Sequence, residues 1–350
     1  MKEAINSVVD QTFNEWELII INDGSTDSSA DLANRLSKND SRIRVFDQAN
    51  MGLSAARNCG ISNSEGGIIG FLDADDRYLP DCLTTVYNIF QHGNLDMLIA
   101  SYLYFKDNLN LHRHKFSNTR VPNEIFLKRN LAPPISHFLN KRIINQIGGF
   151  DSTLNSCEDW DYWIRVGKIG AEIHTSSEVL VAYRYVPTSM SRNPLVMYDA
   201  LTEVSRRAGK PDERLPNDAP HNHEVDLDYP SIQKKHLIRM LGVMLHQGKE
   251  MEAAKWYFKE KKVWNWVEED RDWKGLSSYL SWGYFFDPEQ IEKLLTQTVS
   301  DVAKFFKLLG YLPAKIQYLI KLIFEPQLKR RNHLKYGKIL GGVKNKLGWY

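Results

Sequence analysis

The sequence predicts an α/β protein built on a doubly wound, mainly parallel sheet and followed by a helical C-terminal region. Three observations predict this class. Apolar, strand-like runs alternate with amphipathic helical patterns through the first half of the 350 residues. Polar, turn-rich loops follow the strands, and beyond residue 232 the patterns are helical. In such sheets, ligands bind at the carboxyl ends of the strands.

The elements of the first half follow in a regular order. Ile5, Val8 and Val9 form one apolar face of a helix, and ELIIIN at 17–22 is a buried strand. The loop DGSTDSS then leads into a helix that is capped by Thr26 or Asp27. The next expected elements are strands at 43–48, 66–76 and 95–105, and helices at 53–62 and 80–91.

The pattern is looser after Val121, and it divides the chain into three parts. We expect helices at 124–129, 143–147 and 159–168, and strands at 134–139 and 178–186. A polar stretch with four prolines follows, and it predicts a linker between two domains. The predicted parts are a first domain over 1–196, a linker over 197–231 and a helical region over 232–350.

Charge and cysteine usage narrow the classes of partner and compartment. The net charge of +2 gives no indication of nucleic-acid binding. Residues 303–350, however, carry eleven Lys or Arg and one acid, Glu325, so this segment requires an anionic partner. The three cysteines have no metal-ligand spacing, and the sequence contains neither a signal-peptide pattern nor a long apolar run. We therefore expect a cytoplasmic protein.

Asp23 is the first candidate site residue, because it stands where an apolar strand ends. A carboxylate at that edge can accept hydrogen bonds from a nucleotide base or a ribose hydroxyl. The alternative is an Asx turn that leads into the next helix.

Asp73 and Asp75 flank one alanine directly after a buried strand. Two hard oxygen donors at this spacing can hold Mg²⁺ or Mn²⁺ and leave coordination positions for a diphosphate. The alternative is a solvated acidic turn before the Pro80 helix, with Asp76 or Asp81 as its cap.

Arg57 and the acids of CEDWDY complete the candidate set. Arg57 is the cation of a small-residue helix, where it can neutralise a diphosphate or remain a surface residue. Glu158, Asp159 and Asp161 stand at a helix start, where acids also favour the helix dipole. One of them can instead act as a general base at the mouth of the cleft.

Five segments in this order resemble family 2 glycosyltransferases, which are inverting, metal-dependent enzymes of the GT-A fold that use nucleotide sugars. The segments are EAINSVVDQTFNEWELIIINDGSTDSS, NMGLSAARNCGI, GGIIGFLDADDRYLPDCL, GGFDSTLNSCEDWDYWIR and SMSR, and they lie within residues 1–195. By this resemblance, Asp23 reads the nucleotide base, usually uracil, and Arg57 faces the nucleotide. Asp73 and Asp75 match the family's Asp-x-Asp, with Asp75 as the direct metal ligand.

The resemblance also implies a mechanism. Asp159 matches the catalytic base, with Glu158 beside it as a supporting or acceptor-side group. The expected function is transfer of a sugar from a nucleotide donor, expected to be a UDP-sugar, to a glycan or lipid-linked acceptor in surface polysaccharide or glycolipid synthesis. The alternatives are a non-catalytic protein that binds a nucleotide sugar, and an interaction module formed by the helical half.

The chain departs from the family pattern at its start. Members usually begin with a buried strand that lies between the strands carrying Asp23 and Asp73, whereas this sequence enters at EAI. We expect a truncated start, unpaired backbone on both neighbouring strands, and doubtful activity for the chain as given.

The tail combines apolar and basic residues. An apolar stripe at helical spacing extends over residues 305–323, and the basic block LKRRNHLKYGK follows it. The pattern fits an ordinary docking helix, but the excess of positive charge favours peripheral binding of residues 303–346 to the cytoplasmic face of an anionic membrane.

Overall fold

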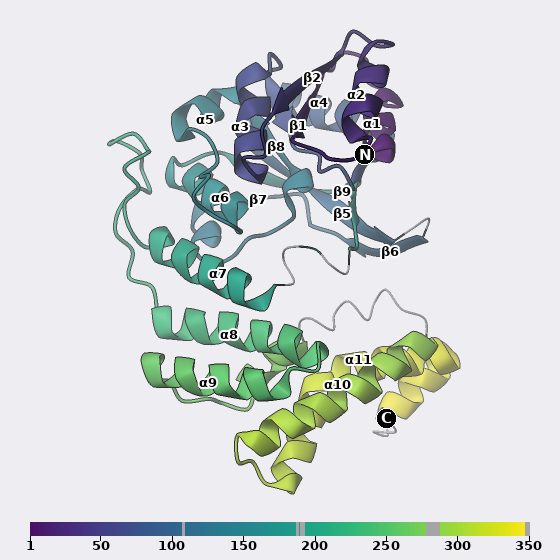
Figure 1. Ribbon diagram of the computed structural model, residues 1–350, viewed down its shortest axis with the longest axis vertical. Helices are drawn as coiled ribbons and strands as arrows, with labels where there is room; N and C mark the ends of the chain where they lie inside the picture. The colour runs from purple at the N-terminus through teal and green to yellow at the C-terminus, as the bar shows by residue number, and fades with distance from the viewer. Residues whose placement is uncertain (107–108, 187–188, 190–192, 278–287, 347–350) are drawn as a thin grey trace. The chain divides into compact units, whose positions relative to one another are not determined.

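The computed structural model describes all residues except 107–108, 187–188, 190–192, 278–287 and 347–350 (Figure 1). The chain divides into two compact units. Unit 1 consists of residues 1–187 and 203–227, and unit 2 of residues 188–202 and 228–350. Each unit is described by itself below.

Unit 1 opens with a strand–helix alternation close to the predicted one (Figure 1). Its elements up to the acidic turn are α1 (Lys2–Val9), β1 (Leu18–Asp23), α2 (Ser29–Ser37), β2 (Ile43–Gln48), α3 (Leu53–Asn63) and β3 (Ile68–Gly70). The predicted strand over 66–76 is only three residues long, because the chain leaves the sheet after Gly70 and then forms a turn in which the Asp76 amide donates to the Asp73 carbonyl at 3.0 Å. The predicted caps of α2 also differ: Asp27 Oδ1 accepts a hydrogen bond from the Ser29 amide, and the residue that precedes the helix is Ser28.

The later part of unit 1 supplies most of the larger sheet. Its elements are β4 (Arg77–Tyr78), α4 (Cys82–His92), β5 (Met97–Lys106), β6 (Leu109–His114), β7 (Thr119–Arg120), η1 (Asn123–Leu127), η2 (Pro134–Ser136), β8 (His137–Asn140), α5 (Lys141–Ile147), α6 (Glu158–Lys168) and β9 (Ile173–Arg184). The predicted helix at 124–129 is the short 3₁₀ helix η1, and β9 begins five residues earlier than predicted.

The described strands form two sheets. β1 and β2 pair in parallel, and α2 and α3 pack on them. The second sheet has seven strands in the main order β3-β8-β5-β9-β4, with β6 on β5 and β7 on β9. The α/β class is confirmed, but the expectation of a mainly parallel sheet is wrong here, because β5–β9 is the one parallel pair among the described pairs of this sheet. Strands β5 to β8 follow each other without an α-helical crossover, and a parallel pairing requires such a crossover.

The open edges expected from the sequence are present. Among the described strands, β1 pairs only with β2, and β3 pairs only with β8. The strands that carry Asp23 and precede Asp73 thus belong to different sheets, and each has one edge without a described strand partner.

The predicted linker over 197–231 is not a simple connection. It holds most of α7 (Pro194–Ala208), and residues 203–227 belong to unit 1. Arg207 pairs with Asp151 at 2.7 Å, and Arg214 pairs at 3.1 Å with the buried Asp161 of α6. These ion pairs hold the polar stretch against unit 1. The sequence pattern could not predict them, because ion pairs produce no hydrophobic periodicity.

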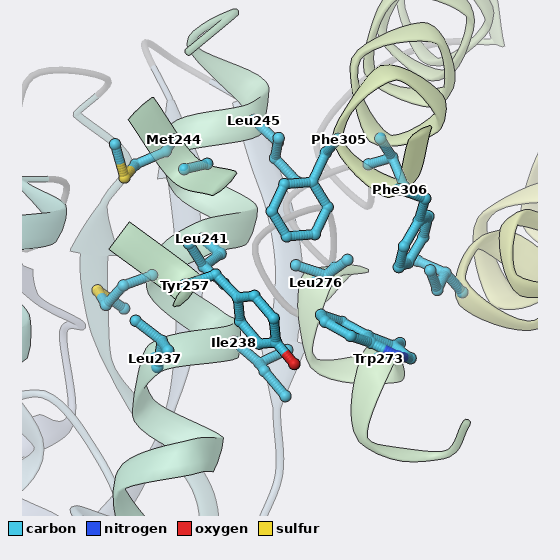
Figure 2. Close-up of a cluster of buried hydrophobic side chains, with 14 of the residues drawn as sticks. Leu237, Ile238, Leu241, Met244, Leu245, Tyr257, Trp273, Leu276, Phe305 and Phe306 are labelled. Carbon is cyan, nitrogen blue, oxygen red and sulfur yellow. The ribbon is translucent and has the colours of Figure 1, made fainter. Parts of the chain in front are cut away.

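Unit 2 is helical and has its own apolar core (Figure 2). Its long helices are α8 (Tyr229–His246), α9 (Glu250–Trp264), α10 (Pro288–Leu308) and α11 (Pro313–Lys346). Tyr257, Trp273, Phe305 and Phe306 are almost completely buried in it. Within the predicted apolar stripe, Phe305, Leu319 and Ile323 are all 0 % exposed. For these residues the interpretation as a docking helix is therefore correct, and the interpretation as a membrane-binding surface is not.

Candidate active site

Arg57 is the centre of the candidate site, in the middle of α3 on unit 1. Its side chain is buried, with an exposed fraction of 7 %. Nη1 donates to Glu158 Oε1 at 2.6 Å, and Nη2 donates to Asp73 Oδ1 at 3.2 Å. The guanidinium also stands over the Phe150 ring at 5.3 Å. Arg57 therefore joins the turn after β3 to the start of α6, although these segments lie 85 positions apart in the sequence.

Asp159, the predicted base, is the second residue of α6 and is half-buried. Its Oδ1 accepts a hydrogen bond from the Trp160 amide, and its Oδ2 accepts one from Asn130 Nδ2 at 2.7 Å. Burial, followed by the charge of Glu158, raises the pKa of Asp159 to about 6, while Arg57 and Asn130 oppose the rise. A carboxylate with this pKa is largely ionised at neutral pH and is a stronger base than an ordinary aspartate.

The acidic turn after β3 carries Asp73, Asp75 and Asp76. Asp76 is 1 % exposed, and its Oδ1 accepts a hydrogen bond from the Arg184 amide at 2.7 Å. Its Oδ2 is buried without a hydrogen-bond partner among the described residues. Burial, together with the charges of the two neighbouring acids, raises the pKa of Asp76 to about 9. Asp76 is therefore neutral at physiological pH.

Asp75 lies in the same negative field. Partial loss of hydration, and then the charge of Asp73, raises the pKa of its carboxyl group. Arg184, at the end of β9, opposes this rise and donates from Nε to the Asp75 carbonyl oxygen at 2.6 Å. Arg57 pairs with Asp73 and Arg184 lies beside Asp75, yet the net effect on the Asp75 carboxyl is a raised pKa, and a bound divalent cation would favour its ionised form.

Asp23 has a different environment. Oδ1 accepts hydrogen bonds from Gln48 Nε2 and the Met51 amide, both at 2.8 Å, and Oδ2 accepts one from the Gly52 amide at 2.9 Å. These bonds lower the pKa of Asp23 against the effect of its desolvation. In this structure Asp23 orders the loop that begins α3, and its remaining acceptor capacity is small.

The structure brings four of the six predicted site residues together: Arg57, Asp73, Glu158 and Asp159. Asp75 lies two positions beyond Asp73, whereas Asp23 is engaged with the loop before α3. Sequence reasoning missed Asn130 and Arg184, which contact the site from distant loops and strand ends. It weighed Asp76 only as a helix cap, and no local spacing marks any of the three.

The described part of the chain contains no group of three or more His, Cys, Asp or Glu side chains arranged to hold a metal ion. A cation at the acidic turn would therefore have few protein ligands. Mg²⁺ and Mn²⁺ sites that hold phosphates are commonly built in this way, with one or two carboxylates and the remaining ligands from substrate and water.

The sequence of the site region matches a known family model. Residues 1–152 match the model described as Glycosyl transferase family 2. This match contains Asp23, Arg57 and the Asp73–Asp75 pair of the family 2 region, while Glu158 and Asp159 follow it closely in sequence.

Two curated relatives show how far the likeness extends. Glycosyltransferase GlyA of Streptococcus pneumoniae is 35 % identical over 107 residues, which cover 31 % of this chain and 15 % of GlyA. The uncharacterized glycosyltransferase EpsJ of Bacillus subtilis is 28 % identical over 213 residues, which cover 55 % of this chain and 60 % of EpsJ. The chain thus spans less than two thirds of the length of these relatives.

A solved structure shares the fold. The crystal structure of S. aureus TarS in complex with UDP-GlcNAc matches with a TM-score of 0.51 and 16 % identity, over 100 % of this chain and 88 % of that one. At this identity the likeness concerns the fold alone, and it agrees with the GT-A class. Within the described residues, no helix has the length and apolar character needed to cross a membrane.

Proposed function

We propose that this chain transfers a sugar from a UDP-sugar to a hydroxyl group of a glycan or lipid-linked acceptor, with inversion at the anomeric carbon. The observation that carries the proposal is Asp159, a carboxylate of raised pKa beside the buried Arg57–Glu158 pair and next to the acidic turn. The family 2 match supports the reaction class. The TarS complex with UDP-GlcNAc supports a uridine donor.

The chemistry assigned to the chain's own residues is a single displacement. Asp159 takes the proton of the acceptor hydroxyl while the oxygen of that hydroxyl attacks the anomeric carbon. The bond from that carbon to the diphosphate oxygen breaks, and the nucleoside diphosphate leaves with the electron pair. Arg57 keeps Glu158 and Asp73 in place, and Glu158 supports Asp159 on the acceptor side.

The acidic turn fits the divalent cation that the family uses. Asp75 and Asp73 offer hard oxygen donors, and the buried Asp76 Oδ2 lacks a described hydrogen-bond partner beside them. We assign Asp75, assisted by Asp73, to hold Mn²⁺ or Mg²⁺. When bound, the cation would neutralise negative charge on the diphosphate. Asp23 and Arg57 are assigned to the nucleotide side.

Calorimetric binding of UDP tests the donor and cation assignments. With Mn²⁺ present, the full chain should bind UDP, and Asp75→Ala should lose the metal-dependent part of this affinity. Asp218→Ala is the matched control, because Asp218 is an exposed acid of the same unit outside the site. Equal metal-dependent affinity in all three proteins would contradict the assignment.

The base assignment has its own measurement. Asp159→Asn should slow sugar transfer by roughly 10²–10⁴-fold, because a general base contributes about that much, while UDP affinity is retained. Transfer at the wild-type rate would exclude Asp159 as the base.

A second candidate is a non-catalytic protein that binds a nucleotide sugar. It is favoured by the separation of β1 from β3 and by the internal hydrogen bonds of Asp23. Donor binding without UDP release, in the presence of a broad set of acceptors, would favour this candidate over the transferase.

The setting of the reaction is the last part of the proposal. We assign the chain to surface polysaccharide or glycolipid synthesis, at the cytoplasmic face of an anionic membrane. The basic tail and the lipid-linked acceptors expected from the family resemblance support this setting.

A further inference from the structure

The end of α11 is a separate short helix in unit 2. Gly337 has φ 73° and ψ 171°, which are not helical values, and it divides the element into two helical parts. A side chain at Gly341 would collide with the backbone of Asn332 and His333. Residues 338–346 therefore fold back closely on the preceding helix, and Gly341 is the residue that permits this approach.

This short helix exposes three large apolar side chains. Ile339 is 88 % exposed, Leu340 is 53 % exposed and Val343 is 48 % exposed. They occupy positions i, i+1 and i+4, so they share one side of the helix. Most apolar residues of 303–324 lie in or against the core of unit 2, although Leu312 is 74 % exposed and Tyr318 is 52 % exposed. At 339–343, three large exposed apolar side chains stand within five residues.

The sequence around the exposed trio is strongly basic. Residues 326–350 contain seven Lys or Arg and no Asp or Glu. Two of the cations form described ion pairs, Arg331 with Glu292 at 3.0 Å and Lys329 with Glu325 at 2.7 Å. Lys338 is exposed next to Ile339, and Lys344 Nζ stands 4.0 Å from the centre of the Tyr336 ring. The short helix thus carries an exposed apolar group, with lysines before and after it in the sequence.

We propose that residues 338–346 bind the surface of an anionic lipid bilayer. Ile339, Leu340 and Val343 enter the boundary between headgroups and acyl chains, and the flanking lysines contact headgroup phosphates. A second copy of the chain fits this surface less well, because two uniformly basic segments repel each other. The proposal rests on the membrane setting given above and is independent of the transfer chemistry.

The proposal corrects the extent of the membrane segment expected from the sequence. Most apolar side chains at 303–324 supply the core of unit 2, so we assign lipid contact to the exposed group after Gly337. Deleting the tail from residue 303 would remove the buried Phe305 and Phe306 and destabilise the unit. Point substitutions on the short helix avoid this loss.

Vesicle sedimentation of the full chain tests the proposal. The probes are vesicles of phosphatidylcholine alone and of phosphatidylcholine mixed with phosphatidylglycerol, at low and high salt. The test protein carries Ile339→Asp and Leu340→Asp. The matched control carries Val263→Asp and Val267→Asp, which replace valines of unit 2 that are 65 % and 80 % exposed.

Wild type and control should sediment with the anionic vesicles at low salt and be released at high salt. The partition coefficient of the test protein should fall by roughly tenfold or more, since interfacial binding scales with buried apolar area. Equal partition of the test and control proteins would overturn the proposal. Equal binding of the wild type to phosphatidylcholine vesicles and to anionic vesicles would also overturn it. A change in molar mass by light scattering in the test protein alone would indicate self-association instead, and would also overturn it.

Release of UDP from a water-soluble donor is measured on the same proteins. It should be the same in wild type, test and control. Because this readout needs no membrane, failure of lipid binding and failure of the proposed transfer reaction can be told apart.

Discussion

The charge state of Asp159 depends on its burial and on its neighbours. Burial and Glu158 favour the protonated form, and Arg57 and Asn130 favour the ionised form. Asn130 is exposed, and its amide is the one side-chain donor described for this carboxylate. A single exposed side chain therefore adjusts the proton affinity of the proposed base.

This balance predicts the pH dependence of transfer. In the proposed mechanism the ionised form of Asp159 is the active one, so the rate should rise with pH, reach half of its plateau near pH 6 and level off about one unit higher. Asn130→Ala removes a hydrogen bond to the ionised form, which raises the pKa of Asp159 and shifts the acid limb to higher pH. The pH–rate profile of UDP release measures both effects. Superimposable profiles for wild type and Asn130→Ala would show that Asn130 does not adjust the base.

Arg57 allows a prediction about stability. Arg57→Ala leaves the carboxylates of Glu158 and Asp73 without their cation, and removing one partner of a buried pair costs about 3–5 kcal/mol. Asp73 is 32 % exposed at its side chain, so we expect about 3 kcal/mol, at the lower end of this range. Arg57→Lys should lose less, because it retains the charge. Urea unfolding of both variants measures the loss in the free energy of unfolding. If Arg57 formed only surface ion pairs, this loss would be below about 1 kcal/mol.

The resemblance of five ordered motifs assigned Arg57, Asp73, Glu158 and Asp159 to one site, and the structure brings these residues together. Asp73 follows a strand and the two acids begin a helix, whereas Arg57 lies in the middle of α3. Asn130 and Arg184 could not be predicted in this way. Each contacts the site through an interaction over many sequence positions, Asn130 with Asp159 and Arg184 with Asp75 and Asp76. Such contacts depend on the path of the whole chain, and no local pattern carries them.

At the level of elements, the helices were more predictable than the strand directions. The 3.6-residue period of α1, α4 and α6 is a local property, and these helices lie close to the expected places. The antiparallel pairing of β8 with β3 and β5 depends on how the loops after β6 return the chain. An apolar run alone does not specify that direction.

The open edge of β1 gives a measurable expectation. In a parallel ladder, successive amides of a strand point alternately to its two sides. Amides that donate to β2 should be protected from hydrogen exchange, whereas the alternating amides of β1 should exchange roughly a hundredfold faster. Exchange measured by NMR on the full chain resolves the six residues Leu18–Asp23. Uniform protection along the strand would mean that this edge has a partner in solution.

At the scale of the whole molecule, the two units contain separate groups of buried residues. Unit 1 buries Phe126, Phe138 and Trp163, and unit 2 buries Phe305, Phe306 and Trp273. Domains with their own cores usually unfold as units. The helical identity of unit 2 was predictable from its pattern, whereas the assignment of residues 203–227 to unit 1 was not, since ion pairs hold them there.

Scanning calorimetry should therefore show two transitions. Phe305→Ala should lower the midpoint of one transition, with a loss of about 3–5 kcal/mol, because it leaves a cavity in the core of unit 2. Phe126→Ala is the matched substitution in unit 1 and should lower the other midpoint. If either substitution moved both transitions equally, the two units would unfold as one.

The position of Arg57 has a further consequence. One guanidinium serves as a shared counter-ion for an acid of the turn after β3 and an acid at the start of α6, and its charge also reaches Asp159. Any ligand that changes its pairing with Asp73 therefore changes the proton affinity of Asp159. Thermodynamic linkage makes the effect reciprocal: a proton on Asp159 changes the affinity for that ligand by the same free energy. A ligand that binds at Asp73 and a proton that binds at Asp159 are therefore thermodynamically coupled through Arg57.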